Sequence, residues 1–134
     1  MAQQGFDRMI ELVELNAGSW KPEAVAIIDV NYKVWWKKGD VPEKFIEYYR
    51  KFPLSDMNAG DSVHSGNTFL MKVTDKTGVI VVMRDLYTAR LAAINLRGRI
   101  NALSDFYSLE KFIMEKEKSY GRIQRMSNTE KVMW

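Results

Sequence analysis

Thr68-Phe-Leu-Met-Lys-Val-Thr-Asp-Lys-Thr-Gly-Val-Ile-Val-Val-Met-Arg84 is the stretch that decides the fold. Its first part places apolar side chains at every second position: Phe69, Met71 and Val73. This period of two predicts a strand with one buried face. Residues 75–78 predict a turn, and the unbroken apolar run at residues 79–83 predicts a central strand covered on both faces. An isolated hairpin is marginal in water, so other strands must flank this one and helices must cover it.

Composition favours one domain that buries an ordinary core. The chain has 134 residues, of which 46% are hydrophobic. A net charge of +3 is too small to indicate a nucleic-acid partner. The absence of cysteine excludes a disulfide framework, a thiol nucleophile and a zinc finger. The N-terminus lacks signal-peptide features and no apolar run approaches membrane-spanning length, so we expect a cytoplasmic protein without a membrane span.

Two strands and a helix are predicted ahead of the hairpin, after an N-terminal helix. Apolar side chains recur at helical spacing over residues 4–16. Residues 23–30 are apolar and β-branched, as in a buried strand, and residues 33–38 form a second strand with lysine at both ends, as edge strands often have. A second helix follows over residues 42–52. The loop after it contains a weak candidate for a third strand near residues 62–64.

The segment after the hairpin has two interpretations. One is a long helix from Asp85, on which Leu91 and Ile94 belong to a wide apolar face with small residues at its centre. The other is a further strand over residues 89–96, with a helix beginning only afterwards. The helix is favoured because residues 96–100 contain no convincing turn between two elements.

Together these elements predict an α/β fold of the α+β type. Their order is α-β-β-α-β-β-β-α, with a central, mostly antiparallel sheet of about five strands flanked by helices and with the third strand weak. We expect a single domain over residues 1–114. Because the apolar periodicity thins out from Glu115, residues 115–134 are expected to form a basic C-terminal extension.

Residues that could perform chemistry are scarce. His64 is the only histidine, and a lone histidine among Gly, Ser and Asp is expected on the surface or in a turn. Asp29 lies just before a predicted turn, where hydrogen bonding to the turn is a better explanation than acid–base work. Residues 60–66 contain two glycines but lack the lysine and hydroxyl residue of a phosphate-binding loop. We therefore expect no catalytic site, cofactor or metal, and no enzymatic activity.

Aromatic side chains exceed what one core stripe needs. Trp35 and Trp36 are adjacent, so on a regular strand they face opposite sides of the sheet. An outward Trp36 between lysines is a candidate for partner contact, and cover by a helix or by the C-terminal extension is the alternative. On the second predicted helix, Phe45, Tyr48 and Tyr49 are similar candidates.

The order of elements resembles the roadblock/dynein light chain family, an α/β fold also related to longin and profilin-like domains. Four segments carry this resemblance: Glu23-Ala-Val-Ala-Ile-Ile-Asp29 with the turn and strand after it, residues 67–74, residues 79–83, and residues 91–97. The chain departs from the family in its first strand-to-strand turn, where Asn31-Tyr32 stands in place of the usual glycine.

The resemblance implies a non-enzymatic scaffold or regulator that forms a homodimer through its second helix and an adjoining sheet edge. The paired surface would then hold a small GTPase or anchor a larger complex. From the surplus of aromatic side chains, we expect Trp36, Phe45, Tyr48 and Tyr49 to contribute to self-association or to partner contact. Two alternatives stay open. One is a profilin-like actin-binding protein, and the other is a small-molecule sensing domain.

Overall fold

The computed structural model describes residues 2–103, 106–112 and 115. It confirms the predicted fold class: a five-stranded antiparallel sheet with strand order β2-β1-β5-β4-β3. The strands are β1 (Ala24–Asp29), β2 (Val34–Lys38), β3 (Ser62–Ser65), β4 (Thr68–Lys72) and β5 (Thr77–Val82). The helices are α1 (Ala2–Asn16), α2 (Glu43–Tyr49) and α3 (Leu86–Gly98), with short 3-10 turns η1 (Leu54–Asp56) and η2 (Ile100–Leu103). Residues 106–112 are also helical.

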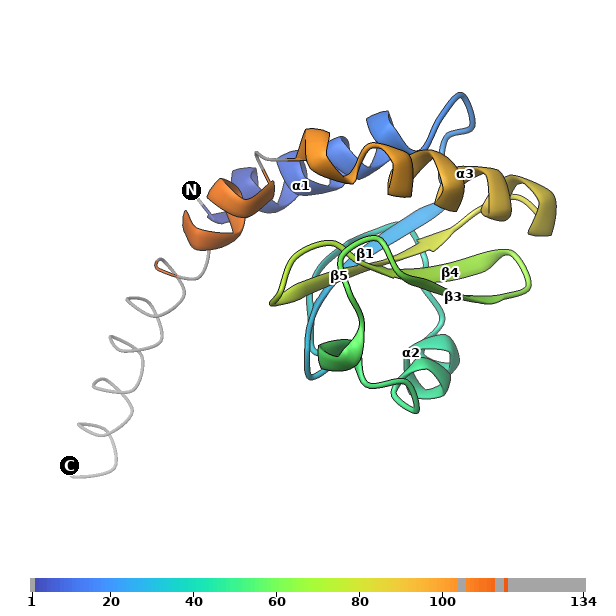
Figure 1. The fold of residues 1–134 in the computed structure, drawn as a ribbon, viewed down its shortest axis with the longest axis horizontal. Coiled ribbons are helices and arrows are strands. Elements are labelled where there is room, and N and C mark those ends of the chain that lie inside the picture. Colours follow the sequence, from blue (N-terminus) through green and yellow to red (C-terminus); the bar gives the residue numbers. More distant parts are fainter. Residues whose placement is uncertain (1, 104–105, 113–114, 116–134) are drawn as a thin grey trace.

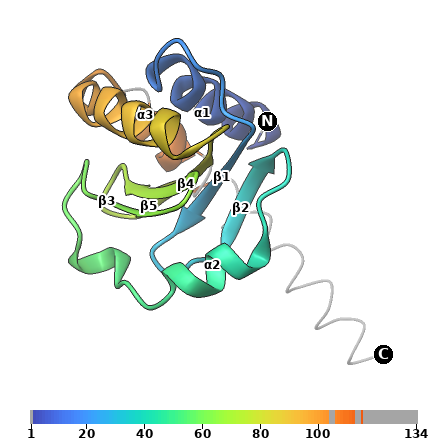
Figure 2. The same cartoon turned by 90° about the vertical axis from the view of Figure 1, so that its right-hand side faces the viewer.

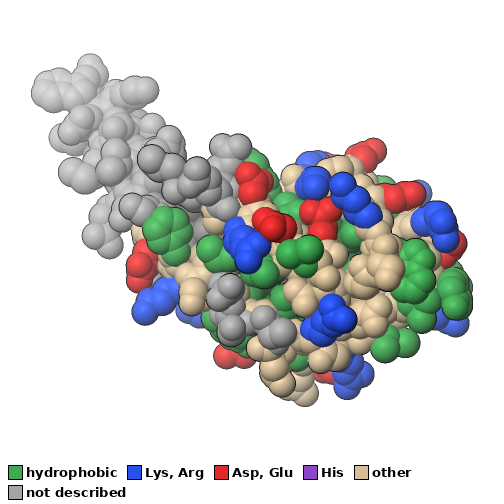
Figure 3. Space-filling view, turned by 90° about the horizontal axis from the view of Figure 1, so that it is seen from above, with side chains coloured by type: hydrophobic (Ala, Val, Ile, Leu, Met, Phe, Trp, Pro, Cys, Tyr) green, Lys and Arg blue, Asp and Glu red, His purple; other side chains and the backbone are tan. Residues whose placement is uncertain are grey.

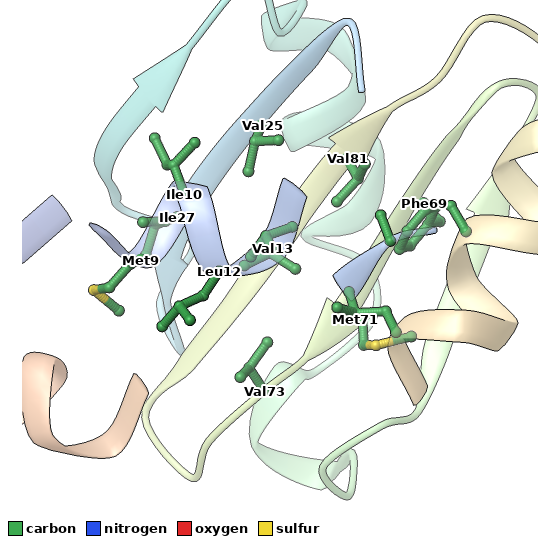
Figure 4. Close-up of a cluster of buried hydrophobic side chains, with 14 of the residues drawn as sticks. Met9, Ile10, Leu12, Val13, Val25, Ile27, Phe69, Met71, Val73 and Val81 are labelled. Carbon is green, nitrogen blue, oxygen red and sulfur yellow. The ribbon is translucent and has the colours of Figure 1, made fainter. Parts of the chain in front are cut away.

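Helices cover both faces of the sheet, with α1 and α3 on one side and α2 on the other (Figures 1 and 2). The core is therefore divided into two clusters of buried side chains. In the larger cluster, α1 lies over β1 and β2, and α3 lies over β4. The buried side chains of this cluster include Met9, Ile10 and Val13 of α1 and Ile27, Phe69 and Val81 of the sheet (Figure 4). The smaller cluster lies between the opposite face of the sheet and α2, around Leu70, Ile80 and Tyr49. The helical spacing predicted for the N-terminal segment is thus confirmed.

The hairpin of β4 and β5 occupies the middle of the sheet, as predicted, but β4 is more buried than its alternating pattern indicates. All five of its residues are buried, including Lys72. The second face of β4 is covered by η1 and α2, because Leu70 packs in the smaller core cluster with Leu54 and Tyr49. The Lys72 ammonium lies 3.5 Å from the Ser55 carbonyl oxygen. The prediction of one buried face is therefore wrong for β4.

The turn between β1 and β2 is built around an aspartate and a left-handed tyrosine. Asp29 Oδ1 accepts hydrogen bonds from the amides of Asn31 at 2.8 Å and Lys33 at 3.0 Å, which confirms its predicted role in the turn. Tyr32 has φ of 64°, the conformation that glycine adopts at least cost. Its side chain is nevertheless buried, and its hydroxyl donates to the Phe52 carbonyl. Burial therefore holds a bulky residue in a conformation that disfavours it.

The segment after the hairpin is helical, so the alternative strand over residues 89–96 is wrong. The Asp85 carboxylate accepts from the Thr88 amide at 2.8 Å, and the Thr88 hydroxyl accepts from the Asp85 amide at 3.2 Å, which together form a capping box. The single long helix is also wrong, because α3 ends at Gly98 and the chain tightens into η2.

The buried face of α3 differs from the predicted one. Its small residues Ala89, Ala92 and Ala93 are buried, whereas Ile94 is 66% exposed. Small side chains let the helix lie close to the sheet, and the larger Ile94 is thereby turned outward.

Two remaining predictions concern boundaries. The second helix is shorter than predicted: α2 begins at Glu43 after Pro42 and ends at Tyr49. The predicted basic extension over residues 115–134 lies outside the described residues except for Glu115. The division into residues 1–114 and 115–134 therefore stays a prediction.

Candidate protein-interaction surface

Trp36 lies on the α1 side of the sheet, together with its neighbour Trp35. The pairing of β1 with β2 shifts register by one residue, since Ile27 lies opposite Trp36 and Ile28 lies opposite Val34. Trp35 is thus the extra residue of a β-bulge, and a bulge breaks the alternation of side chains between the two faces. The prediction that the two tryptophans face opposite sides is therefore wrong.

Both rings contact Phe6 of α1. The ring of Trp36 stacks on Phe6 with centroids 5.6 Å apart, and Trp35 lies 6.3 Å from the same ring. Trp36 Nε1 also donates to the Asp7 carboxylate at 3.1 Å. These contacts leave Trp36 half-buried. Helix α1 therefore covers part of the ring, which was the predicted alternative to partner contact. Sequence reasoning missed Phe6 and Asp7 as its partners, because an i, i+3 stripe does not show which strand a helix will cross.

On α2, the two neighbouring tyrosines have opposite roles. Tyr49 has no exposed surface, and its hydroxyl donates to the Thr68 carbonyl at 3.0 Å. Burial raises the pKa of this hydroxyl to about 12. The predicted contact role of Tyr49 is therefore corrected: its side chain anchors α2 to β4. Tyr48, by contrast, is 43% exposed.

Aromatic side chains with exposed surface lie on α2 and just after it; we call them the α2 rim and define it as Phe45, Tyr48 and Phe52. The Tyr48 ring lies 5.8 Å from that of Phe52, and both Phe45 and Phe52 are partly buried against the smaller core cluster. The ammonium groups of Lys44 and Lys51 lie 5.6 Å and 5.5 Å from the rings of Phe45 and Tyr48. The rim is thus an apolar patch flanked by positive charge.

The α2 rim lies on the β4 side of α2. The other side of α2 lines a cleft of about 370 Å³ together with the start of β2, through Glu43, Ile46 and Arg50. Tyr49 reaches β4 through its hydroxyl bond, and Val63 of β3 packs against the same core cluster as the rim. The rim and β3, the strand at one edge of the sheet, thus border the same core cluster.

The predicted contact residues consequently do not form one surface. Trp36 belongs to the edge strand β2 and faces α1, whereas Phe45 and Tyr48 lie across the sheet on α2. Only Phe45 and Tyr48 are brought together. Phe52, which is not among the predicted contact residues, lies beside Tyr48.

The polar residues considered as chemical candidates are dispersed. His64 on β3 contacts the Ser62 hydroxyl at 3.1 Å, and burial, with the charge of Arg90, lowers its pKa. Within the described ranges, no three His, Asp or Glu side chains gather in a way that could hold a metal ion. Seen from the side of α1 and α3, positive and negative side chains are interspersed rather than separated (Figure 3). None of the helices in the described part of the chain is both long and apolar enough to cross a membrane.

Comparison with known proteins gives a match only at the level of structure. No family profile and no curated protein matches this sequence. Among solved structures, an MglB with a tetrameric arrangement has a TM-score of 0.54 at 16% identity, covering 81% of this chain and 92% of its own. Myxococcus xanthus MglB has a TM-score of 0.45 at 12% identity, covering 79% of this chain and 90% of its own. MglC from Myxococcus xanthus has a TM-score of 0.41 at 12% identity, covering 71% of this chain and 98% of its own.

The first of these matches extends over most of both chains, and MglB is a roadblock/longin-like protein. At this identity the likeness concerns the fold alone. The chain thus has the roadblock fold, as the resemblance of its sequence predicted.

Proposed function

We propose that this protein is a non-enzymatic interaction module that pairs with itself through the α2 rim and the edge strand β3. The observation that carries the proposal is the weak anchoring of α2, of whose seven residues only Ile46 and Tyr49 are buried. The side chains of Phe45 and Tyr48 remain available at its outer side. Isologous pairing would bury two copies of this rim at once.

The edge strand offers a second contribution to the same interface. β3 has four residues and pairs with β4 alone, so its other edge carries backbone donors and acceptors without a strand partner in the described chain. Two β3 edges can join antiparallel and extend the sheet across a twofold axis. The tetrameric arrangement of an MglB with the same fold supports self-association by a chain of this kind.

Sedimentation velocity of the whole chain up to high micromolar concentration tests the pairing. The double variant Phe45→Ala/Tyr48→Ala should weaken the dimer by about tenfold or more, because truncating aromatic anchors at an interface commonly costs more than 1 kcal/mol each. Tyr87→Ala is the matched control, since Tyr87 is an exposed tyrosine on α3, 70% exposed and away from α2. A wild-type chain that stays monomeric, or a control that weakens pairing equally, would refute the proposal.

Trp36 is a separate candidate on the opposite face. Its ring is held by Phe6 and Asp7, so it presents a fixed surface beside the positively charged Lys37 and Lys38. We propose that it contacts a partner rather than the second copy. Trp36→Ala should then leave the dimer unchanged while reducing the recovery of a bound protein.

We further propose that the partner is a small GTPase or a larger complex, which is what the roadblock resemblance implies. Affinity capture from native lysate, followed by identification of bound proteins, tests this directly. A GTPase partner should be recovered unequally from lysate supplied with GDP and lysate supplied with a non-hydrolysable GTP analogue. Recovery of actin instead would favour the profilin-like alternative.

A further inference from the structure

A pocket at the end of the β4–β5 hairpin holds a buried carboxylate, one of whose two oxygens lacks a hydrogen-bond partner. The pocket has a volume of about 390 Å³ and lies between the hairpin turn, at Thr74 and Lys76, and the helical residues 106–112, at Tyr107 and Glu110. Cavities of this size accommodate small ligands. Glu110 is only 6% exposed, and its Oε1 atom makes no hydrogen bond.

The Thr74 hydroxyl interacts with the Glu110 carboxylate, but the Oε1 atom is left without a partner. The Thr74 hydroxyl already accepts from the amides of Lys76 at 3.2 Å and Thr77 at 3.0 Å, and it shares a hydrogen bond with the Thr77 hydroxyl. Lys76 and Lys111 line the pocket, yet among the described residues neither forms an ion pair with Glu110. A buried acceptor without a donor is costly, and a buried charge without a counter-charge costs more.

We propose that this pocket binds a small organic cation that carries N–H donors, a primary ammonium or a guanidinium, with Glu110 as its anion. The unsatisfied atom is an acceptor, so the ligand must donate. Charge-assisted hydrogen bonds to a carboxylate are among the strong ones, which favours a cation over a neutral donor.

The rest of the lining fits such a ligand. Asp75 adds a second carboxylate to the wall. Tyr107 adds a half-exposed ring, beside which an alkyl stem or a cationic head group can lie. The site shares no residue with the α2 rim, so it would give an interaction module a small-molecule input, as in the sensing alternative.

Three probes with related shapes separate the requirements for charge and for a donor. The whole ¹⁵N-labelled chain is titrated with n-butylammonium, with n-butanol, which has the same stem without charge, and with tetramethylammonium, which has charge without N–H. Butylammonium should shift the amide resonances of residues 74–77, and the other two compounds should not. A parallel titration with n-butylguanidinium identifies the preferred head group.

Glu110→Gln keeps the shape and removes the charge, and it should weaken binding by about tenfold or more. Glu11→Gln is the control, because Glu11 lies in an exposed pair with Arg8 on α1. Thermal melts establish that both variants fold. The proposal is overturned if neither cation produces shifts, if butanol or tetramethylammonium binds equally, or if Glu110→Gln binds as wild type does. Because the probes act on the wild-type chain, this result is independent of dimerisation.

Discussion

Replacing Tyr32 with glycine sets two physical effects against each other. The wild-type residue has φ of 64°, where a side chain costs about 1–2 kcal/mol that glycine does not incur. Tyr32 is also 5% exposed and donates its hydroxyl hydrogen to the Phe52 carbonyl. Removing a buried aromatic side chain costs about 3–5 kcal/mol. We therefore expect Tyr32→Gly to lower the free energy of unfolding by about 2–3 kcal/mol.

Two companion variants divide that effect. Tyr32→Phe keeps the ring and loses the hydrogen bond, so it should cost about 1 kcal/mol. Asn31→Gly is the control for added chain freedom in the same turn, because Asn31 is exposed and its backbone amide keeps its hydrogen bond to the Asp29 carboxylate. This variant should lower the free energy of unfolding by no more than about 1 kcal/mol.

Urea unfolding and thermal melts, both followed by tryptophan fluorescence, measure all three variants. For a chain of this size, Tyr32→Gly should lower the melting temperature by roughly 10 °C. If Tyr32→Gly proves as stable as wild type or more stable, backbone strain outweighs burial at this turn. Burial of the Tyr32 side chain would then not compensate for its positive φ, contrary to our explanation.

Three further changes test other parts of the fold. Gly39→Ala should cost at least about 2 kcal/mol in urea unfolding, because Gly39 has φ of 82° and an added Cβ would lie 2.5 Å from the Glu23 carbonyl oxygen; a neutral result would contradict this. The hydrogen bond from the Thr88 backbone amide holds the pKa of the Asp85 carboxyl below its usual value. The stability advantage of wild type over Asp85→Ala should therefore be complete above the unfolded pKa and decline as the pH falls through the folded pKa. Burial raises the pKa of Glu110. The stability of wild type relative to Glu110→Gln should thus be greatest below the pKa of Glu110 in the unfolded chain, and it should decline as the pH rises through the pKa of Glu110 in the folded chain. Thermal melts from acidic to neutral pH should therefore show opposite trends for the Asp85 and Glu110 variants.

The strongest predictions from sequence concern elements whose pattern is local. The apolar spacing of residues 4–16 predicts a helix, which the structure has as α1, and the apolar run from Val79 predicts a buried strand, which the structure has as β5. The turn role of Asp29 also follows from its own neighbours, since it bonds to amides two and four residues away. These features depend on periodicity and short-range hydrogen bonds, which a sequence displays directly.

The candidate surface was only partly predictable, because exposure depends on what lies across the sheet. Tyr48 and Tyr49 are neighbours of the same type, and the packing of α2 on the sheet, where Tyr49 reaches the Thr68 carbonyl, decides which of them is buried. Trp36 faces α1 because a bulge at Trp35 changes its side, and no local pattern marks that bulge.

The sequence by itself determined the order of helices and strands and the central place of the hairpin, since both follow from the spacing of apolar residues and from turn chemistry. Tertiary structure alone decided that β4 is buried on both faces, that α3 turns its alanines inward, and that Glu110 is enclosed without a partner. These outcomes depend on contacts between segments far apart in the chain. Burial of a side chain is a property of its surroundings, and those surroundings exist only once the layers have packed.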